Sequence, residues 1–107
     1  MKTLAEAKRK IEIGNKVFVK NFIKEKEEIR EVTGKNTVSI TTYSPTTKSI
    51  MKNTVGADVI MEWQRARDTR IVGNKVQFLA KEGLVDNHTI KDLKEKGMDY
   101  WLELEVL

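Results

Sequence analysis

The fold is decided by a stretch that reads Tyr100-Trp101-Leu102-Glu103-Leu104-Glu105-Val106. Its even-numbered residues are apolar and alternate with Trp101 and two glutamates. A period of two is typical of a strand that buries one face and exposes the other. We therefore predict a paired strand over residues 100–106, with Leu102 and Leu104 in the core.

The N-terminal segment carries the pattern of a short helix over Leu4–Ile11. Thr3 and Glu6 have the spacing of a capping box, in which each side chain binds a free backbone N–H. Apolar residues recur at i, i+3 and i+7, which places them on one side of a helix. Gly14 and Asn15 are expected to end this helix.

Segments rich in β-branched and aromatic residues predict three strands after the helix. A charged connection, residues 24–28, and the turn Gly34-Lys35-Asn36 are expected to join them. In the middle strand a bulge or a helical turn competes with regular pairing, because Ile29 and Val32 are three residues apart. The three predicted strands are Val17–Ile23, Ile29–Thr33 and Thr37–Tyr43.

Three more elements are predicted before the last strand. Val59–Trp63 forms one strand, and Thr69–Ala80 forms a hairpin that turns at Gly73-Asn74, because a two-residue Gly-Asn connection matches the twist of paired strands. Thr89–Glu95 is predicted to form a short C-terminal helix. The whole chain, residues 1–107, is expected to be a single α+β domain. Its architecture would be a small twisted antiparallel β-sheet or a partly open barrel with an N-terminal helix and a short C-terminal helix.

A polar segment, Ser44–Asp58, separates the two groups of strands and contains the only proline. Loops longer than about 12–15 residues are uncommon inside compact domains and are often functional or mobile, so this segment is a candidate binding loop. The alternative is that Ile50, Met51 and Val55 fold this segment onto the core. Both interpretations follow from the residues.

Composition narrows the class of protein. No apolar run approaches the roughly 20 residues that a membrane-spanning helix needs, the N-terminus lacks the apolar part of a signal peptide, and the chain has no cysteine. A cytoplasmic protein is expected.

The charge is unevenly distributed along the chain. Residues 1–75 carry 16 Lys and Arg against 9 Asp and Glu, a charge of +7, and residues 76–107 carry 4 against 7, a charge of −3. This asymmetry fits either a face that binds a polyanion or a solvated lysine-rich surface.

The residues offer no recognisable catalytic or metal-binding group. The only histidine, His88, lies in a predicted polar turn, so His- and Cys-based metal sites cannot form. Most acidic residues lie in runs with lysines, and the glycines are scattered, so neither a two-metal carboxylate centre nor a phosphate-binding glycine loop is indicated. We expect a protein that is not an enzyme and has no cofactor.

The segment from Trp63 to Arg70 is the most suggestive of binding. If it is extended, Trp63, Arg65 and Arg67 share one face, and an aromatic ring with two guanidinium groups is able to stack on bases or bind phosphates. The alternative places Trp63 in the core with the arginines simply exposed. The candidate binding residues are Trp63, Arg65, Arg67, Arg70, Lys48 and Lys52.

Two stretches of the chain resemble short proteins encoded by phages and mobile elements of Gram-positive bacteria. They are Leu4-Ala5-Glu6-Ala7-Lys8-Arg9-Lys10-Ile11 with Gly14-Asn15-Lys16-Val17, and Met61–Ile71 with Asn74 and Phe78. Such proteins often have a proline after the Glu-Trp pair, where this chain has Gln64. Residues 81–107 lie outside the resemblance.

The resemblance implies a small inhibitor that is not an enzyme, such as the type II-A anti-CRISPR proteins that block RNA-guided nucleases. It carries no residue role over to this chain. Its partner would be a host protein or a ribonucleoprotein complex, and the net charge of +4 argues against mimicry of DNA. A basic inhibitor would contact RNA or an acidic face of its target. The alternative function is a small basic regulator that binds DNA or RNA.

Overall fold

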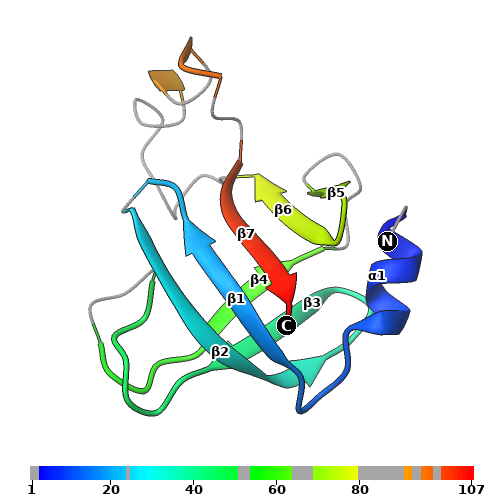
Figure 1. Cartoon of the computed structure of the whole chain (residues 1–107), viewed down its shortest axis with the longest axis vertical. Helices are drawn as coiled ribbons and strands as arrows, with labels where there is room; N and C mark the ends of the chain where they lie inside the picture. The colour runs from blue at the N-terminus through cyan, green and yellow to red at the C-terminus, as the bar shows by residue number, and fades with distance from the viewer. Residues whose placement is uncertain are drawn as a thin grey trace.

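Seven antiparallel strands form one curled sheet in the computed structural model of the chain (Figure 1). The structure describes residues 3–23, 25–50, 54–63, 69–79, 91–92, 95–97 and 100–107. The strands lie side by side in the order β4-β3-β2-β1-β7-β6-β5. They are β1 (Lys16–Asn21), β2 (Lys26–Lys35), β3 (Ser39–Tyr43), β4 (Val59–Glu62), β5 (Thr69–Val72), β6 (Lys75–Leu79) and β7 (Tyr100–Val106).

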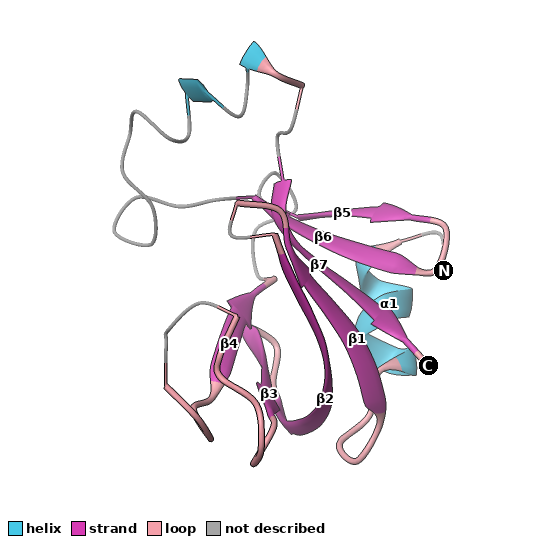
Figure 2. Ribbon diagram, turned by 60° about the vertical axis from the view of Figure 1, so that its left-hand side comes forward, coloured by secondary structure: helices cyan, strands magenta, loops and turns pink. Residues whose placement is uncertain are grey.

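The strand order is that of an up-and-down barrel interrupted at one place. Strands that follow one another in the chain are neighbours, except β4 and β5, which form the two edges of the sheet. The first and last strands, β1 and β7, pair with each other from Val17–Val106 to Asn21–Leu102. Figure 2 shows the sheet curling so that β3 and β4 lie across from β5 and β6. The result is a half-barrel with its opening between β4 and β5.

Side chains on the inner face of the half-barrel form the core. Alternate residues of each strand point inward, as the pairing of a pleated sheet requires. Val19 and Val76 both pair with Leu104 of β7, which places Leu104 at the middle of the inner face. The buried apolar residues that the strands contribute are Val17, Val19, Val32, Ile40, Val59, Met61, Val76, Phe78, Trp101, Leu102 and Leu104.

The predicted N-terminal helix is confirmed as α1 (Leu4–Lys10), but it ends at its C-cap, Ile11, before the predicted stop at Gly14 and Asn15. The Thr3 hydroxyl accepts a hydrogen bond from the backbone N–H of Glu6 at 3.2 Å and caps the helix. Ala7 and Ile11 are fully buried in the core. The helix contacts β5, and it reaches the turn between β2 and β3 through Lys8 and Lys35.

The middle strand of the first group, β2, is longer than predicted. Residues 26–28 belong to it, so the chain reverses before them, where Glu25 has a φ of 53°. The predicted turn at Gly34-Lys35-Asn36 lies later, because Gly34 and Lys35 still pair with β3. The Asn36 side chain makes that turn by accepting hydrogen bonds from the backbone N–H groups of Val38 and Ser39, each at 2.8 Å. A bulge does occur in this strand, between Val32 and Gly34.

The hairpin between β5 and β6 turns where the sequence predicted. Gly73 has a φ of 63°, whereas Asn74 is not among the residues with positive φ. A positive φ at the first central residue alone is the signature of a type II′ turn, which suits the twist of the strands.

The predicted last strand is confirmed as β7, but its residue Trp101 does not follow the predicted alternation of buried and exposed side chains. Leu102 and Leu104 are buried as predicted, but Trp101 is buried as well, at 3% exposure. The pairing of β7 with β6 shifts here, since Phe78 pairs with Leu102 and Leu79 with Tyr100. Trp101 is therefore the extra residue of a β-bulge, and a bulge turns its side chain away from the regular alternation.

The segment 44–58 packs partly against the half-barrel. Ser49 and Ile50 are buried, and the Asn21 side chain donates a hydrogen bond to the Ile50 carbonyl at 2.7 Å. Val55 is 55% exposed, and Met51 lies outside the described residues. The interpretation as part of the core thus holds for Ile50 and not for Val55.

The α+β class holds in its coarse form: in the described residues the sheet is accompanied by one bounded helix, α1. Of the predicted C-terminal helix Thr89–Glu95 only residues 91, 92 and 95 are described; these three are helical, but the described residues do not form a continuous C-terminal helix. Within the described part of the chain, no helix has the length and apolar character needed to cross a bilayer.

Candidate protein-binding surface

Trp63, the aromatic residue of the predicted basic face, lies in the core. Its side chain is fully buried, and its indole Nε1 donates a hydrogen bond to the Asn36 carbonyl at 2.9 Å. The Lys8 ammonium lies 5.8 Å from the centre of the Trp63 ring. Trp63 therefore joins the end of β4 to α1 and to the turn between β2 and β3, and its ring is not on the surface.

Of the predicted cations, only Lys48 and Arg70 are among the described residues, and they lie on different segments. Lys48 forms an isolated β-bridge with Val55 in the segment after β3, whereas Arg70 lies on β5. Along the sheet, four other strands separate β3 from β5. The Arg70 guanidinium Nε donates to the Gln77 side chain at 2.7 Å. The other predicted cations, Lys52, Arg65 and Arg67, lie outside the described residues.

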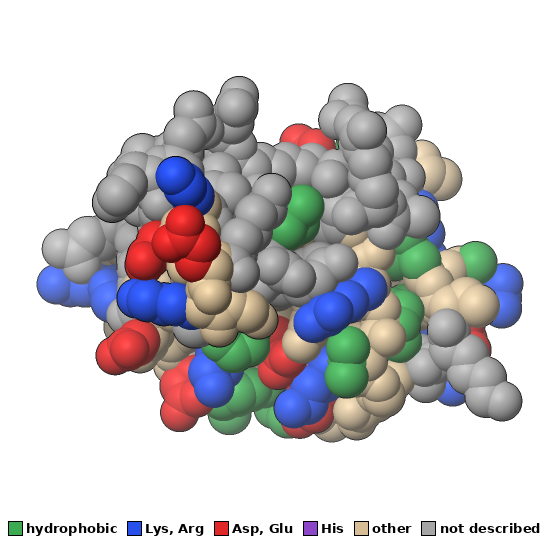
Figure 3. All heavy atoms as spheres, turned by 90° about the horizontal axis from the view of Figure 1, so that it is seen from above, with side chains coloured by type: hydrophobic (Ala, Val, Ile, Leu, Met, Phe, Trp, Pro, Cys, Tyr) green, Lys and Arg blue, Asp and Glu red, His purple; other side chains and the backbone are tan. Residues whose placement is uncertain are grey.

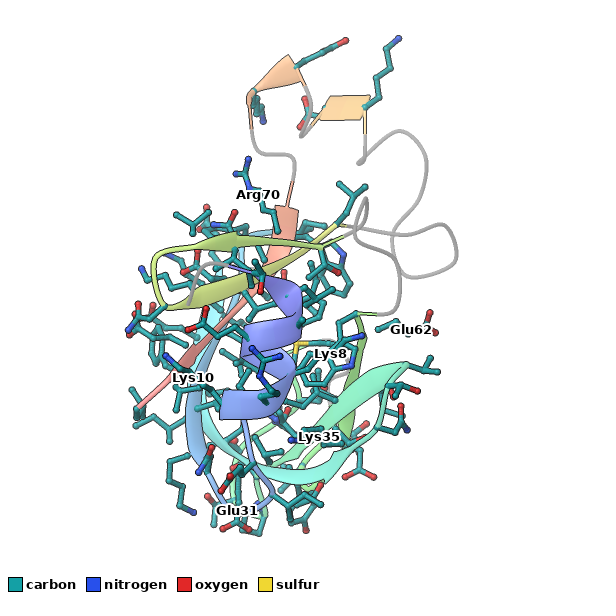
Figure 4. All side chains as sticks on the ribbon, turned by 90° about the vertical axis from the view of Figure 1, so that its right-hand side faces the viewer. Lys8, Lys10, Glu31, Lys35, Glu62 and Arg70 are labelled. Atoms are coloured by element: carbon teal, nitrogen blue, oxygen red, sulfur yellow. The ribbon has the colours of Figure 1, made fainter. Side chains whose placement is uncertain are left out.

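The cations around α1 are mostly engaged with protein oxygens. The ammonium groups of Lys8 and Lys35 donate to the backbone carbonyls of Thr37 and Lys8, at 2.9 and 2.8 Å. The Lys10 ammonium pairs with the Glu6 carboxylate at 3.0 Å. Figure 4 shows Lys8 and Lys35 beside the helix and Arg70 at a distance from both. These contacts fasten the helix to the sheet and use donors that a phosphate would otherwise bind.

Two of the acidic residues that make residues 76–107 negative, Glu103 and Glu105, lie next to basic residues in the structure. The acidic strand β7 lies between β1 and β6, so its glutamates sit among basic residues on the outer face of the sheet. The Lys75 ammonium lies 3.5 Å from the Glu103 carboxylate and 4.0 Å from that of Glu105. Figure 3 likewise shows acidic and basic side chains interspersed on one side of the molecule. On that side of the molecule, the described side chains therefore form no broad area of a single sign.

A shallow hollow of about 360 Å³ lies on the outer face where β1, β2 and β3 meet. Ile29 of β2 is exposed at 58%, and Tyr43 at the end of β3 is half-buried. Pro45 and Thr46 continue the lining from the first turn after β3. The buried residues Arg30 and Ser44 also line the hollow. We call its exposed and half-buried part the Ile29 surface, which is formed by Lys16, Ile29, Glu31, Tyr43, Pro45 and Thr46.

The pairing of the strands places these side chains next to one another. Ile29 pairs with Phe18 of β1, and Glu31 pairs with both Lys16 and Tyr43. The Lys16 ammonium and the Glu31 carboxylate are 3.4 Å apart and border the apolar residues. Exposed aliphatic and aromatic groups with a charged border are the usual arrangement at the centre of a protein–protein interface.

Sequence reasoning missed the Ile29 surface, although a signal for it was present. From the sequence alone, the three-residue spacing of Ile29 and Val32 indicates only a bulge or a helical turn in the strand. An odd spacing in a strand places two residues on opposite faces, so with Val32 buried Ile29 must point outward. The role of Tyr43 and Pro45 depends on how the chain leaves β3, and the sequence does not encode that in a short pattern.

The described residues contain no group of three or more His, Asp or Glu side chains arranged to hold a metal ion. His88 lies outside them. No protein family, curated protein or solved structure matches this chain.

Proposed function

We infer that this chain is a cytoplasmic binding protein, not an enzyme, which inhibits a host protein or a protein–nucleic-acid complex through the Ile29 surface. The observation that supports this proposal best is the 58% exposure of Ile29 beside Tyr43 and Pro45 in a hollow with a charged border. Exposed side chains of this kind gain free energy by burial against a partner at about 25 cal/mol per Å² of apolar area.

The proposal favours a protein surface over free nucleic acid as the main contact. Binding to nucleic acid depends on cations that neutralise phosphates. Around α1 and on β6, most described cations already bind carboxylates or carbonyls of the chain. A hollow that combines exposed apolar side chains with charged ones instead fits a partner that presents its own apolar and charged residues.

The resemblance to mobile-element proteins suggests one specific target, a type II-A RNA-guided nuclease. The test is DNA cleavage by the purified nuclease, with this protein added either before or after the guide RNA. We expect inhibition when the protein is added first and little inhibition when it is added last, because the proposed action is on assembly of the complex. Equal cleavage with and without the protein, in both orders, would reject this target.

The substitution Ile29→Asp tests the surface itself. An aspartate at the centre of an apolar contact is left desolvated in the complex, so we expect the inhibitory or binding affinity to fall by about tenfold or more. Val72→Asp is the matched control, because Val72 is 46% exposed on β5, at the far edge of the sheet. Both variants should keep the melting temperature of the parent protein. Equal losses in the two variants would count against the Ile29 surface.

The alternative function, a regulator that binds DNA or RNA, makes a different prediction for Arg65 and Arg67. Each neutralised phosphate contributes about −0.7 to −0.9 to the log–log slope of affinity against salt. The double change Arg65→Gln and Arg67→Gln should then flatten that slope by roughly one to two units and weaken binding to every nucleic-acid sequence. Binding that survives nuclease treatment and keeps its salt slope in this variant would support a protein partner instead.

A further inference from the structure

The Ile29 surface contains a projecting side chain and a recess beside it. Ile29 is 58% exposed on the outer face of the sheet, and the hollow next to it has a volume of about 360 Å³. A cavity of about 150 Å³ is sufficient for benzene, so this hollow has room for the side chain of a second isoleucine. The surface therefore offers a projection and a recess that fit each other when two copies meet.

The charges beside Ile29 are also complementary to those of a second copy. Lys16 and Glu31 pair across β1 and β2, and their side chains are 63% and 45% exposed at a separation of 3.4 Å. Both residues border the same hollow. When two copies face each other about a two-fold axis, Lys16 of each copy comes within reach of Glu31 of the other. The contact then sets opposite charges against each other, which favours association.

Aromatic side chains flank Ile29 on both neighbouring strands. Val17 and Val19 are buried, so Phe18 between them faces outward, where it pairs with Ile29 and is half-buried. On the other side of β2, Tyr43 of β3 lines the hollow and is also half-buried. Aromatic residues are enriched at the centre of protein–protein interfaces. The outer face around Ile29 thus has an apolar centre that extends over three strands.

From these observations we propose that two copies of this chain associate through the Ile29 surface in a two-fold symmetric dimer. The symmetry follows because a patch that contacts a copy of itself forms a closed pair. The contact is small, since three strands with about five residues along each cover on the order of 250 Å² in projection. Interfaces that bury less than about 1,200 Å² in total are weak, so we expect a dissociation constant on the order of 100 µM.

This inference deepens the proposed function and rests on the same surface, because a dimer covers the residues that would bind the target. Self-association and target binding then compete, and dilution of the protein uncovers the surface. The dimer itself needs no target, so the pure chain is sufficient for its test. A chain that inhibits a target and stays a monomer would overturn the dimer alone, whereas a dimer without any target would overturn the proposed function alone.

Sedimentation velocity of the full chain measures the dimer directly. Between about 1 µM and 1 mM protein, a range that brackets the expected dissociation constant, we expect the average mass to rise from that of one chain, 12.3 kDa, toward twice that value. Ile29→Asp should remain a monomer over the whole range, because the contact would desolvate the new carboxylate. Val72→Asp is the matched control on β5 and should associate like the parent protein.

Exchanging the charges at the border tests whether the two copies use this surface. Lys16→Glu gives the surface two acidic residues and Glu31→Lys gives it two basic ones, so each variant alone should associate at least about tenfold more weakly than the parent protein. A one-to-one mixture of the two variants should regain the affinity of the parent protein, because opposite charges then face each other.

Lys96→Glu and Asp92→Lys are the matched controls for the exchange. These residues form an exposed pair at 3.0 Å, with side chains 63% and 49% exposed, in a segment away from β3 and the start of β1 (orange in Figure 1). Mixing the two controls should raise the average mass no further than either variant reaches alone. A parent protein that stays at 12.3 kDa up to about 1 mM would overturn the proposal. So would an Ile29→Asp variant that still dimerises, or a mixture of Lys16→Glu and Glu31→Lys that is no heavier than its components.

Discussion

Replacing Arg30 with methionine is expected to lower the free energy of unfolding by about 3–5 kcal/mol. The Arg30 side chain is fully buried and forms an ion pair with Glu28, whose side chain is 8% exposed. Its guanidinium also donates to the Thr42 hydroxyl at 3.0 Å and to the carbonyls of Thr42 and Ala57. Methionine would leave the Glu28 carboxylate and the carbonyls of Thr42 and Ala57 without this donor, and that cost exceeds the gain from removing a charge from the core.

Urea denaturation of matched variants checks this value. Lys16→Met is the control, because it breaks the exposed pair between Lys16 and Glu31, and such pairs contribute about 1 kcal/mol or less. The double change Arg30→Met and Glu28→Leu should recover much of the loss, since it removes both charges together. A loss below about 1 kcal/mol for Arg30→Met would mean that the guanidinium is solvated.

The same substitution should loosen the segment 44–58. Arg30 binds this segment at Ala57, and Asn21 binds it at Ile50, so two polar side chains from the inner face hold it in place. We expect faster hydrogen exchange in residues 44–58 of Arg30→Met and unchanged exchange in α1.

Sequence patterns were sufficient wherever local pairing decides the structure. The alternation after Tyr100 located β7, and the Gly73-Asn74 pair located the hairpin between β5 and β6. Trp63 also carried a readable signal, since it follows Val59 and Met61 at a period of two and therefore shares their buried face. The same period of two argues against the hypothesis that the Trp63 ring lies on the surface.

Other features depend on contacts between distant segments, and local patterns do not predict them. The bulge at Trp101 exists because β6 and β7 change register, although the residues of β7 alternate as if the strand were regular. The burial of Arg30 requires acceptors from Thr42 and Ala57, which are 12 and 27 residues away in the chain. The Ile29 surface shares this limit, because it combines residues from three strands.

Leu104→Ala is expected to destabilise the protein by about 2–5 kcal/mol, because it opens a cavity in the middle of the inner face. Leu104 is fully buried, and it pairs with Val19 of β1 on one side and Val76 of β6 on the other. For a domain of this size, each kcal/mol corresponds to roughly 4–8 °C in melting temperature. Leu107→Ala is the matched control, since Leu107 is 63% exposed and its truncation should change stability by about 0.5 kcal/mol or less.

The size of the effect at Leu104 also tests the strand order. Strand β7 pairs with β1 on one side and with β6 on the other. It is therefore the strand that connects β1–β4 to β5 and β6 in the sheet. Deleting residues 100–107 should therefore abolish cooperative thermal unfolding as well as lower the melting temperature. A truncated chain that unfolds cooperatively at the melting temperature of the parent protein would place β7 outside the sheet, and the half-barrel order would be wrong. Circular dichroism of Leu104→Ala, Leu107→Ala and the truncated chain distinguishes a lost side-chain contact from a lost strand.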